Sequence, residues 1–194
     1  SIHLNDRLST ATLLHFENRQ MDHDGNSDGF MDMPKLRQYN LMHRWAYVSP
    51  VWISQLMLRG LRDERDGGQS RKHANPVSSE PLYSTSVKTN RYEMQWKNGF
   101  TINADHNTSV ALMLHGSWHD ADHIFGMTQY DVTQKNGYAQ LMFETDFNDN
   151  HNLSVGASFN HDYYDERFNP LGASPNAESK VTKETTPGIY AQYT

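Results

Sequence analysis

The chain has no cysteine among its 194 residues, and none of its apolar runs approaches the ~20 residues that a membrane helix requires. The first absence excludes disulfides, thiolate metal sites and thiol chemistry. The second excludes a protein that crosses a membrane with helices. The N-terminal segment SIHLNDRLST also lacks the apolar stretch of a signal peptide, so any export signal lies outside this sequence.

Apolar residues are scarce for a protein with a conventional core. They make up 36% of the chain, and the mean hydropathy is −0.81. Yet 11% of the residues are aromatic, which is not typical of a disordered chain. Strands with one polar and one apolar face would give this combination.

Several functions are disfavoured by what else is missing. The net charge is −6 and no basic run offsets it, so nucleic acid is not expected as a partner. We find no nucleophile paired with a base, no phosphate-binding loop and no carboxylates predicted to converge. The sequence therefore does not predict an enzyme.

Alternation of apolar and polar side chains with a period of two residues dominates the chain. In NRYEMQWKNG, Tyr92, Met94 and Trp96 point to one side, and charged or amide side chains point to the other. The pattern recurs near 8–19, 38–47, 55–59, 110–119, 139–147, 153–160 and 189–193. We therefore expect one all-β domain, an antiparallel meander of about eight amphipathic strands.

The connections between these segments alternate in length. Those at 48–51, 101–108 and 148–152 are short, whereas the spans near 20–34, 65–86, 120–135 and 165–186 are long and polar. This rhythm predicts tight turns at one end of the meander and long loops at the other.

The aromatic residues favour a membrane barrel over a soluble sheet. Some lie beside the short turns (Trp45, Tyr47, Trp52, Trp96) and others toward the long loops (Phe16, Trp118, Phe159, Tyr163). Two aromatic girdles around an apolar band are typical of outer-membrane barrels. A soluble antiparallel sheet with one wet face remains the alternative.

Four segments carry a resemblance to a known family: HDGNSDGFMDMPKLRQYNLMHRWAY, TNRYEMQWKNGF, SVALMLHGSWHDADHIFGMTQYDVTQKNGYAQLMFETDF and ETTPGIYAQYT. They resemble the barrel of TonB-dependent outer-membrane receptors, in particular those of Bacteroidetes-type bacteria. The resemblance implies a barrel of about 22 strands that follows a plug domain. No plug is seen in residues 1–194, and both ends look cut, so we expect a partial barrel domain.

The resemblance also implies a function and partners. It implies import of a scarce, bulky ligand, such as an iron–siderophore complex, haem or cobalamin, across the bacterial outer membrane. The expected partners are outer-membrane lipid, the remainder of the receptor with its plug, TonB through that plug, and a surface lipoprotein.

The segment HGSWHDADH invites a metal or haem hypothesis. Positions four apart on a strand lie ~13 Å apart, so His115 and His119 cannot share one ion there. His119, Asp120 and His123 would converge only if the chain turned after Trp118. The alternative is that these histidines are solvated side chains of the lumen and loops.

The segment MDHDGNSDGFMDMP has the spacing of a calcium loop. The predicted ligands follow the first nine positions of an EF-hand loop: the side chains of Asp24, Asn26, Asp28 and Asp32 and the carbonyl of Phe30. Gly29 stands at the position of the sharp turn. Lys35 replaces the bidentate Glu at the twelfth position, and Pro34 rules out the flanking helix.

We therefore predict a structural Ca²⁺ on a strand scaffold, with an acidic turn as the alternative. The same loop motivates a second functional hypothesis, in which the chain is a soluble calcium-dependent β-sheet module that binds carbohydrate or protein.

Overall fold

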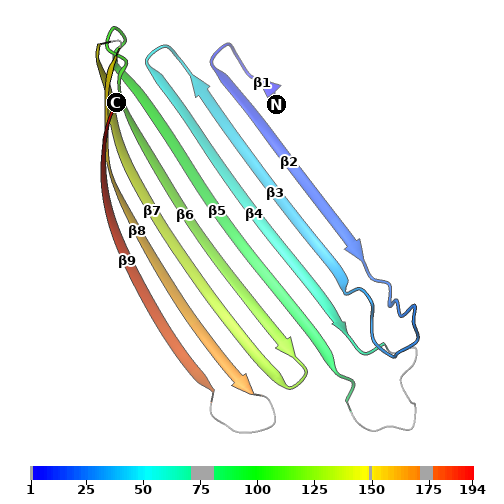
Figure 1. The fold of residues 1–194 in the computed structure, drawn as a ribbon. Coiled ribbons are helices and arrows are strands. Elements are labelled where there is room, and N and C mark those ends of the chain that lie inside the picture. The colour runs from blue at the N-terminus through cyan, green and yellow to red at the C-terminus, as the bar shows by residue number, and fades with distance from the viewer. Residues whose placement is uncertain (1, 71–80, 149, 171–176) are drawn as a thin grey trace.

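The protein forms one sheet of nine antiparallel strands in a computed structural model that describes residues 2–70, 81–148, 150–170 and 177–194. Each strand pairs with the next in sequence, from β1 to β9 (Figure 1). The strands are β1 (Ile2–His3), β2 (Leu8–Arg19), β3 (Lys35–Val48), β4 (Trp52–Gly68), β5 (Ser84–Asn103), β6 (Thr108–Phe125), β7 (Thr128–Asn148), β8 (His151–Pro170) and β9 (Glu178–Tyr193). The predicted all-β meander is confirmed, and the sheet is open rather than closed into a barrel.

The strands are long. β5 contains 20 residues and β7 contains 21, against ~5–6 in an average strand. The described residues contain no helix able to cross a membrane.

The two ends of the sheet differ, although less than predicted. The short connections lie together at one end, and the 20–34 loop lies at the other (Figure 1). The predicted loop at 120–135 is wrong, because β6 and β7 run through it and are joined only by Gly126 and Met127. Polar side chains here do not interrupt the strands, because β6 and β7 remain paired as far as Phe125 and Thr128.

The predicted loops at 65–86 and 165–186 are shorter than expected for the same reason. β4 continues to Gly68 and β5 begins at Ser84, while β8 continues to Pro170 and β9 begins at Glu178. Parts of both connections, 71–80 and 171–176, lie outside the described residues.

Strand register brings the apolar positions of neighbouring strands onto one face. Trp96 pairs with Leu56 on β4 and with Leu114 on β6. Leu114 pairs with Ala139, which pairs with Phe159 on β8. Directly paired residues project from the same side of a sheet, so the apolar face is continuous from strand to strand.

This apolar face has no cover in the described part of the chain. Among the described apolar residues only Leu36 and Ala121 are buried. Leu14 is 78% exposed and Ile189 is 90% exposed. A chain of this length ordinarily buries most of the surface of its unfolded state, whereas this sheet leaves most of its apolar face exposed.

Gly126 supports the tight turn between β6 and β7. Its φ is +60°, which L side chains rarely adopt, and a Cβ there would lie 2.6 Å from Cε2 of Tyr83. The turn thus needs glycine for conformation and for space.

Replacement of Gly126 by alanine should lower the free energy of unfolding by about 1 kcal/mol or more. Gly137→Ala on β7 is the matched control, because nothing lies within 4 Å of its built Cβ. Chemical denaturation of both variants measures the difference. Equal losses of stability would contradict the role assigned to the Gly126 turn.

Candidate functional site

The polar face of the sheet carries a charged cluster on β4 and β5. Glu93 is held between two guanidinium groups, with Nη2 of Arg91 at 2.7 Å and Nη1 of Arg59 at 3.3 Å. Nε of Arg59 also donates to Oδ1 of Asn40 over 3.4 Å. The side chain of Glu93 is 11% exposed, so this carboxylate is desolvated and compensated by two cations.

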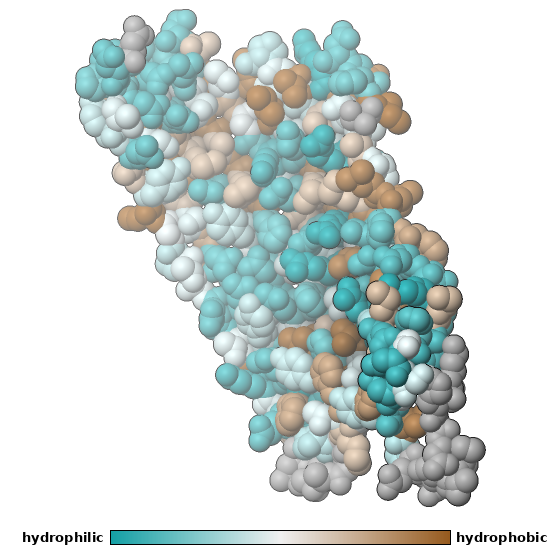
Figure 2. Space-filling view, turned by 45° about the vertical axis from the view of Figure 1, so that its right-hand side comes forward, coloured by the Kyte–Doolittle hydropathy of each residue, from teal (hydrophilic) through white to brown (hydrophobic). Residues whose placement is uncertain are grey.

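Amide and hydroxyl groups continue this polar face across β6, β7 and β8. Nδ1 of His115 lies 3.2 Å from Oδ1 of Asn136. Asn136 in turn donates to Oδ1 of Asn160 at 2.8 Å and to Oδ1 of Asp162 at 2.9 Å. Figure 2 shows one side of the sheet, on which hydrophilic side chains cover most of the middle. The cross-strand pairs form a wetted wall and do not converge on one reactive point.

The histidines of β6 do not form the convergent site that the metal or haem hypothesis requires. β6 does not turn after Trp118, and His119 pairs with Arg91 and Gln134 in an uninterrupted ladder. His123 lies four residues further along the same face, ~13 Å away. Asp120 faces the opposite side, where its Oδ1 accepts a hydrogen bond from Thr133 over 2.7 Å. Alternation on a straight strand therefore rules out convergence of His119, Asp120 and His123.

The acidic loop between β2 and β3 is anchored on the segment that follows β4. The backbone of Met31 donates to Gly68 O, and that of Ser70 donates to Gly29 O, both at 2.8 Å. The hydroxyl of Ser70, which is 1% exposed, donates to Oδ1 of Asp22 over 2.7 Å. The predicted metal-binding loop is thus held in place by a second segment of the chain, which includes Gly68 and Ser70.

Inside the loop, the predicted ligand side chains accept hydrogen bonds from the loop backbone. Asp24 Oδ2 accepts from the N–H of Gly29 at 3.0 Å, and Asp28 Oδ1 accepts from that of Phe30 at 2.8 Å. Further bonds are Asp28 N–H to Asn26 Oδ1 (3.2 Å) and Gly25 N–H to Asp32 Oδ2 (2.7 Å). Gly29, with φ of +87°, makes the sharp turn that the sequence assigns to it.

The bond from Gly29 to Asp24 joins the sixth and first positions of the predicted calcium loop. An acidic turn without metal would make the same set of bonds. No group of three or more His, Asp or Glu side chains in the described ranges is arranged to hold an ion. A carboxylate offers about four lone-pair sites, however, so one hydrogen bond does not exhaust its capacity for a cation. The residues fit Ca²⁺ in donor type, and calcium stays a prediction.

Two contacts could not be predicted from the sequence, one at the acidic loop and one on the polar face. Ser70 is 48 residues from Asp22 in the chain, and no local pattern links them. The contact of Glu93 with Arg91 follows from alternation along β5, but its contact with Arg59 follows only from the register of β4 with β5.

No family model, curated protein or solved structure matches this chain. The resemblance to TonB-dependent receptors thus remains a prediction from the sequence segments that carry it.

The contact between Asp22 and Ser70 should couple the two segments energetically. Asp22→Ala and Ser70→Ala, alone and together, form a double-mutant cycle, whose coupling free energy we expect to be about 0.5–3 kcal/mol. Chemical denaturation gives the free energies, and hydrogen exchange at the N–H groups of Met31 and Ser70 shows whether the effect is local. Strictly additive effects would contradict the anchoring of the loop through this hydrogen bond.

Proposed function

We propose that residues 1–194 form part of the barrel wall of a bacterial outer-membrane transporter of the TonB-dependent receptor type. The imported ligand would be scarce and bulky, such as an iron–siderophore complex, haem or cobalamin. One observation carries the proposal: an uncovered apolar face that runs in register across the sheet, opposite a face of paired polar groups. Lipid outside and water inside satisfy both faces.

The length of the apolar band supports a membrane. On β4 the positions on the apolar face run from Trp52 through Leu56 and Leu58 to Arg62. These roughly ten residues span ~33 Å along the strand at ~3.3 Å each. A strand tilted by ~40° would cross ~25 Å of apolar layer, the height of the band in outer-membrane barrels.

Aromatic contacts border this band at both ends. Near the short turns, the rings of Trp52 and Phe100 stack with centroids 5.9 Å apart. Near the long loops, Tyr92 stacks on Trp118 at 5.5 Å. The Trp and Tyr rings prefer the membrane–water interface, because one end of each side chain is apolar and the other is polar.

The open edges of the sheet support assembly with more strands. β9 pairs only with β8 among the described elements, and β1 pairs with only the first residues of β2. Unpaired backbone groups are costly in lipid, so the rest of the receptor barrel would supply their partners. In this proposal a plug domain fills the barrel and contacts TonB, and a surface lipoprotein meets the long loops. The chain itself is assigned no reaction.

A soluble module is disfavoured by the same observation. It would leave residues such as Leu14, Leu141 and Ile189, each more than half exposed, in water along one continuous face. The hydrogen-bonded acidic loop is compatible with either function and does not favour the soluble one.

The barrel proposal predicts that two adjacent substitutions on β7 differ in effect. Leu141 pairs with Leu112 and Ala157 on the apolar face, whereas Gln140 pairs with Met113 and Ser158 on the polar face. Leu141→Arg should destabilise the protein in lipid by about 2–4 kcal/mol, and Gln140→Arg should have an effect near zero. Cell fractionation followed by unfolding in phospholipid vesicles tests this. Absence of the wild-type protein from the outer membrane, or equal effects of both variants, would overturn the proposal.

We also propose that the loop over 20–34 binds a structural Ca²⁺ through Asp24, Asn26, Asp28, Asp32 and the carbonyl of Phe30. Its support is the ligand spacing, with Gly29 at the turn position and Asp24 bonded across to it. When bound, the ion would supply positive charge that stiffens an acidic loop on the outer side of the membrane.

Calorimetric titration of the folded receptor should show calcium uptake that Asp24→Ala plus Asp28→Ala abolishes. Asp105→Ala is the control, because Asp105 lies in a turn at the opposite end of the sheet. Unchanged uptake in the double variant would contradict the site, whereas it would leave the barrel proposal intact.

A further inference from the structure

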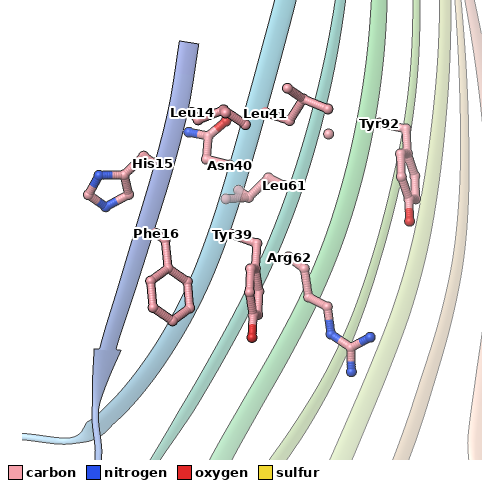
Figure 3. A pocket seen from close by; sticks show the side chains of 10 residues that line it. Leu14, His15, Phe16, Tyr39, Asn40, Leu41, Leu61, Arg62 and Tyr92 are labelled. Carbon is pink, nitrogen blue, oxygen red and sulfur yellow. The ribbon is translucent and has the colours of Figure 1, made fainter.

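A groove of about 540 Å³ opens on the apolar face where β2, β3, β4 and β5 lie side by side. Figure 3 shows its lining, with Phe16, Tyr39 and Arg62 in a row on three consecutive strands. The volume falls within the ~300–1,000 Å³ of typical ligand pockets. The groove is open, and it lies at the long-loop end of the apolar band.

A glycine in β4 forms the floor of the groove. Gly60 lies between Leu41 of β3 and Tyr92 of β5, and both neighbours project from the apolar face. A Cβ at Gly60 would touch only the ring of Tyr92, at 3.6 Å. The rings of Phe16 and Tyr39, 5.1 Å apart, form the side toward β2. The missing side chain thus leaves an apolar slot between aromatic rings.

Positive charge collects at the rim of the slot. Arg62 binds Oε1 of Glu64 through Nη2 at 2.6 Å and through Nε at 3.0 Å. Arg37 approaches the other carboxylate oxygen of Glu64 to 3.6 Å. Lys88, the cross-strand partner of Glu64 on β5, also pairs with Asp122 on β6, which balances its charge. The excess at the rim therefore comes from Arg62 and Arg37, which share the single carboxylate of Glu64. This local excess stands on a chain whose net charge is −6.

The side chains of Arg62 and Arg37 are available to a ligand. They are 63% and 47% exposed, respectively. A guanidinium carries five N–H donors, and Glu64 engages Arg62 through only two of its nitrogens. Arginine binds phosphate through paired hydrogen bonds that are stronger than neutral ones.

We propose that this groove is a binding site for a phosphate-bearing membrane lipid, with an acyl chain over Gly60 and the phosphate between Arg62 and Arg37. The inference rests on the proposed function, because only a membrane barrel presents this face to lipid. Charge complementarity selects the occupant: an apolar slot of this volume ends at an excess of cations, and a phospholipid carries an apolar chain that ends at an anion. Arg62 also stands at the border of the apolar band, where headgroups begin.

The test measures lipid retention by the intact protein purified from membranes in detergent. Native mass spectrometry would follow binding of dioleoyl phosphatidic acid, with dioleoylglycerol as the same lipid without phosphate and inorganic phosphate as the anion alone. The variants are Arg62→Gln with Arg37→Gln, which removes the cations, and Gly60→Leu, which fills the slot. Arg65→Gln is the matched control, since Arg65 pairs with Asp63 on the opposite face of the same strand.

The wild-type protein and Arg65→Gln should retain phosphatidic acid about tenfold more strongly than the double arginine variant. Gly60→Leu should reduce retention of both lipids, and inorganic phosphate should not displace phosphatidic acid. Retention independent of the phosphate group, or unaffected by either set of substitutions, would overturn the inference while leaving a membrane-integrated barrel. A protein absent from the membrane fraction would instead overturn the proposed function.

Discussion

The structure depends on the pairing register of long antiparallel strands. Side chains alternate between the two faces of a strand, so a slip of one residue in any pair would move its apolar set to the polar side. Leu56, Trp96 and Leu114 fall in one row only because β4, β5 and β6 pair as they do. The continuous apolar face is thus a property of the whole ladder. In the proposed function, a membrane would give that face the environment that a buried core gives an ordinary domain.

The polar face follows from the same register. The charge of Glu93 is compensated by two arginines. Arg59 lies opposite it on β4, and Arg91 precedes it by two positions on β5. Such pairs stabilise little when fully solvated, but they prevent uncompensated charge where neighbouring side chains exclude water. The resulting wall is polar, and its charges are paired both along and across the strands.

Much of the fold could be predicted from the sequence because period-two alternation is a strong local signal. Alternation in the NRYEMQWKNG segment alone assigns its faces correctly, and the same rule assigns Leu114 to the apolar face of its own strand. Strand ends were less predictable. The region 120–135 is rich in polar residues, and composition cannot distinguish a loop from two strands that both face water. Only the two-residue turn at Gly126 reveals that the ladder continues.

The candidate sites could also be predicted only in part. The spacing from Asp24 to Phe30 predicts a calcium loop with its sharp turn at Gly29. The structure has that turn, and bound calcium stays a prediction. The contact of this loop with Ser70 could not be predicted, because it depends on how far β4 extends toward the loop. The groove was missed for a related reason. Gly60 is an isolated glycine in an alternating strand, and the space that it leaves becomes evident only once Tyr39 and Tyr92 are placed on the neighbouring strands.

The central claim, that one face of the sheet meets lipid and the other meets water, has a direct measurement. The chain contains no cysteine, so single cysteines at 110–119 on β6 can be spin-labelled without background in the protein reconstituted in vesicles. Collision rates with oxygen, which concentrates in lipid, should peak at Val110, Leu112, Leu114, Gly116 and Trp118. Collision rates with a water-soluble nickel chelate should peak at the intervening positions. Equal exposure of both sets to the nickel chelate would contradict the account.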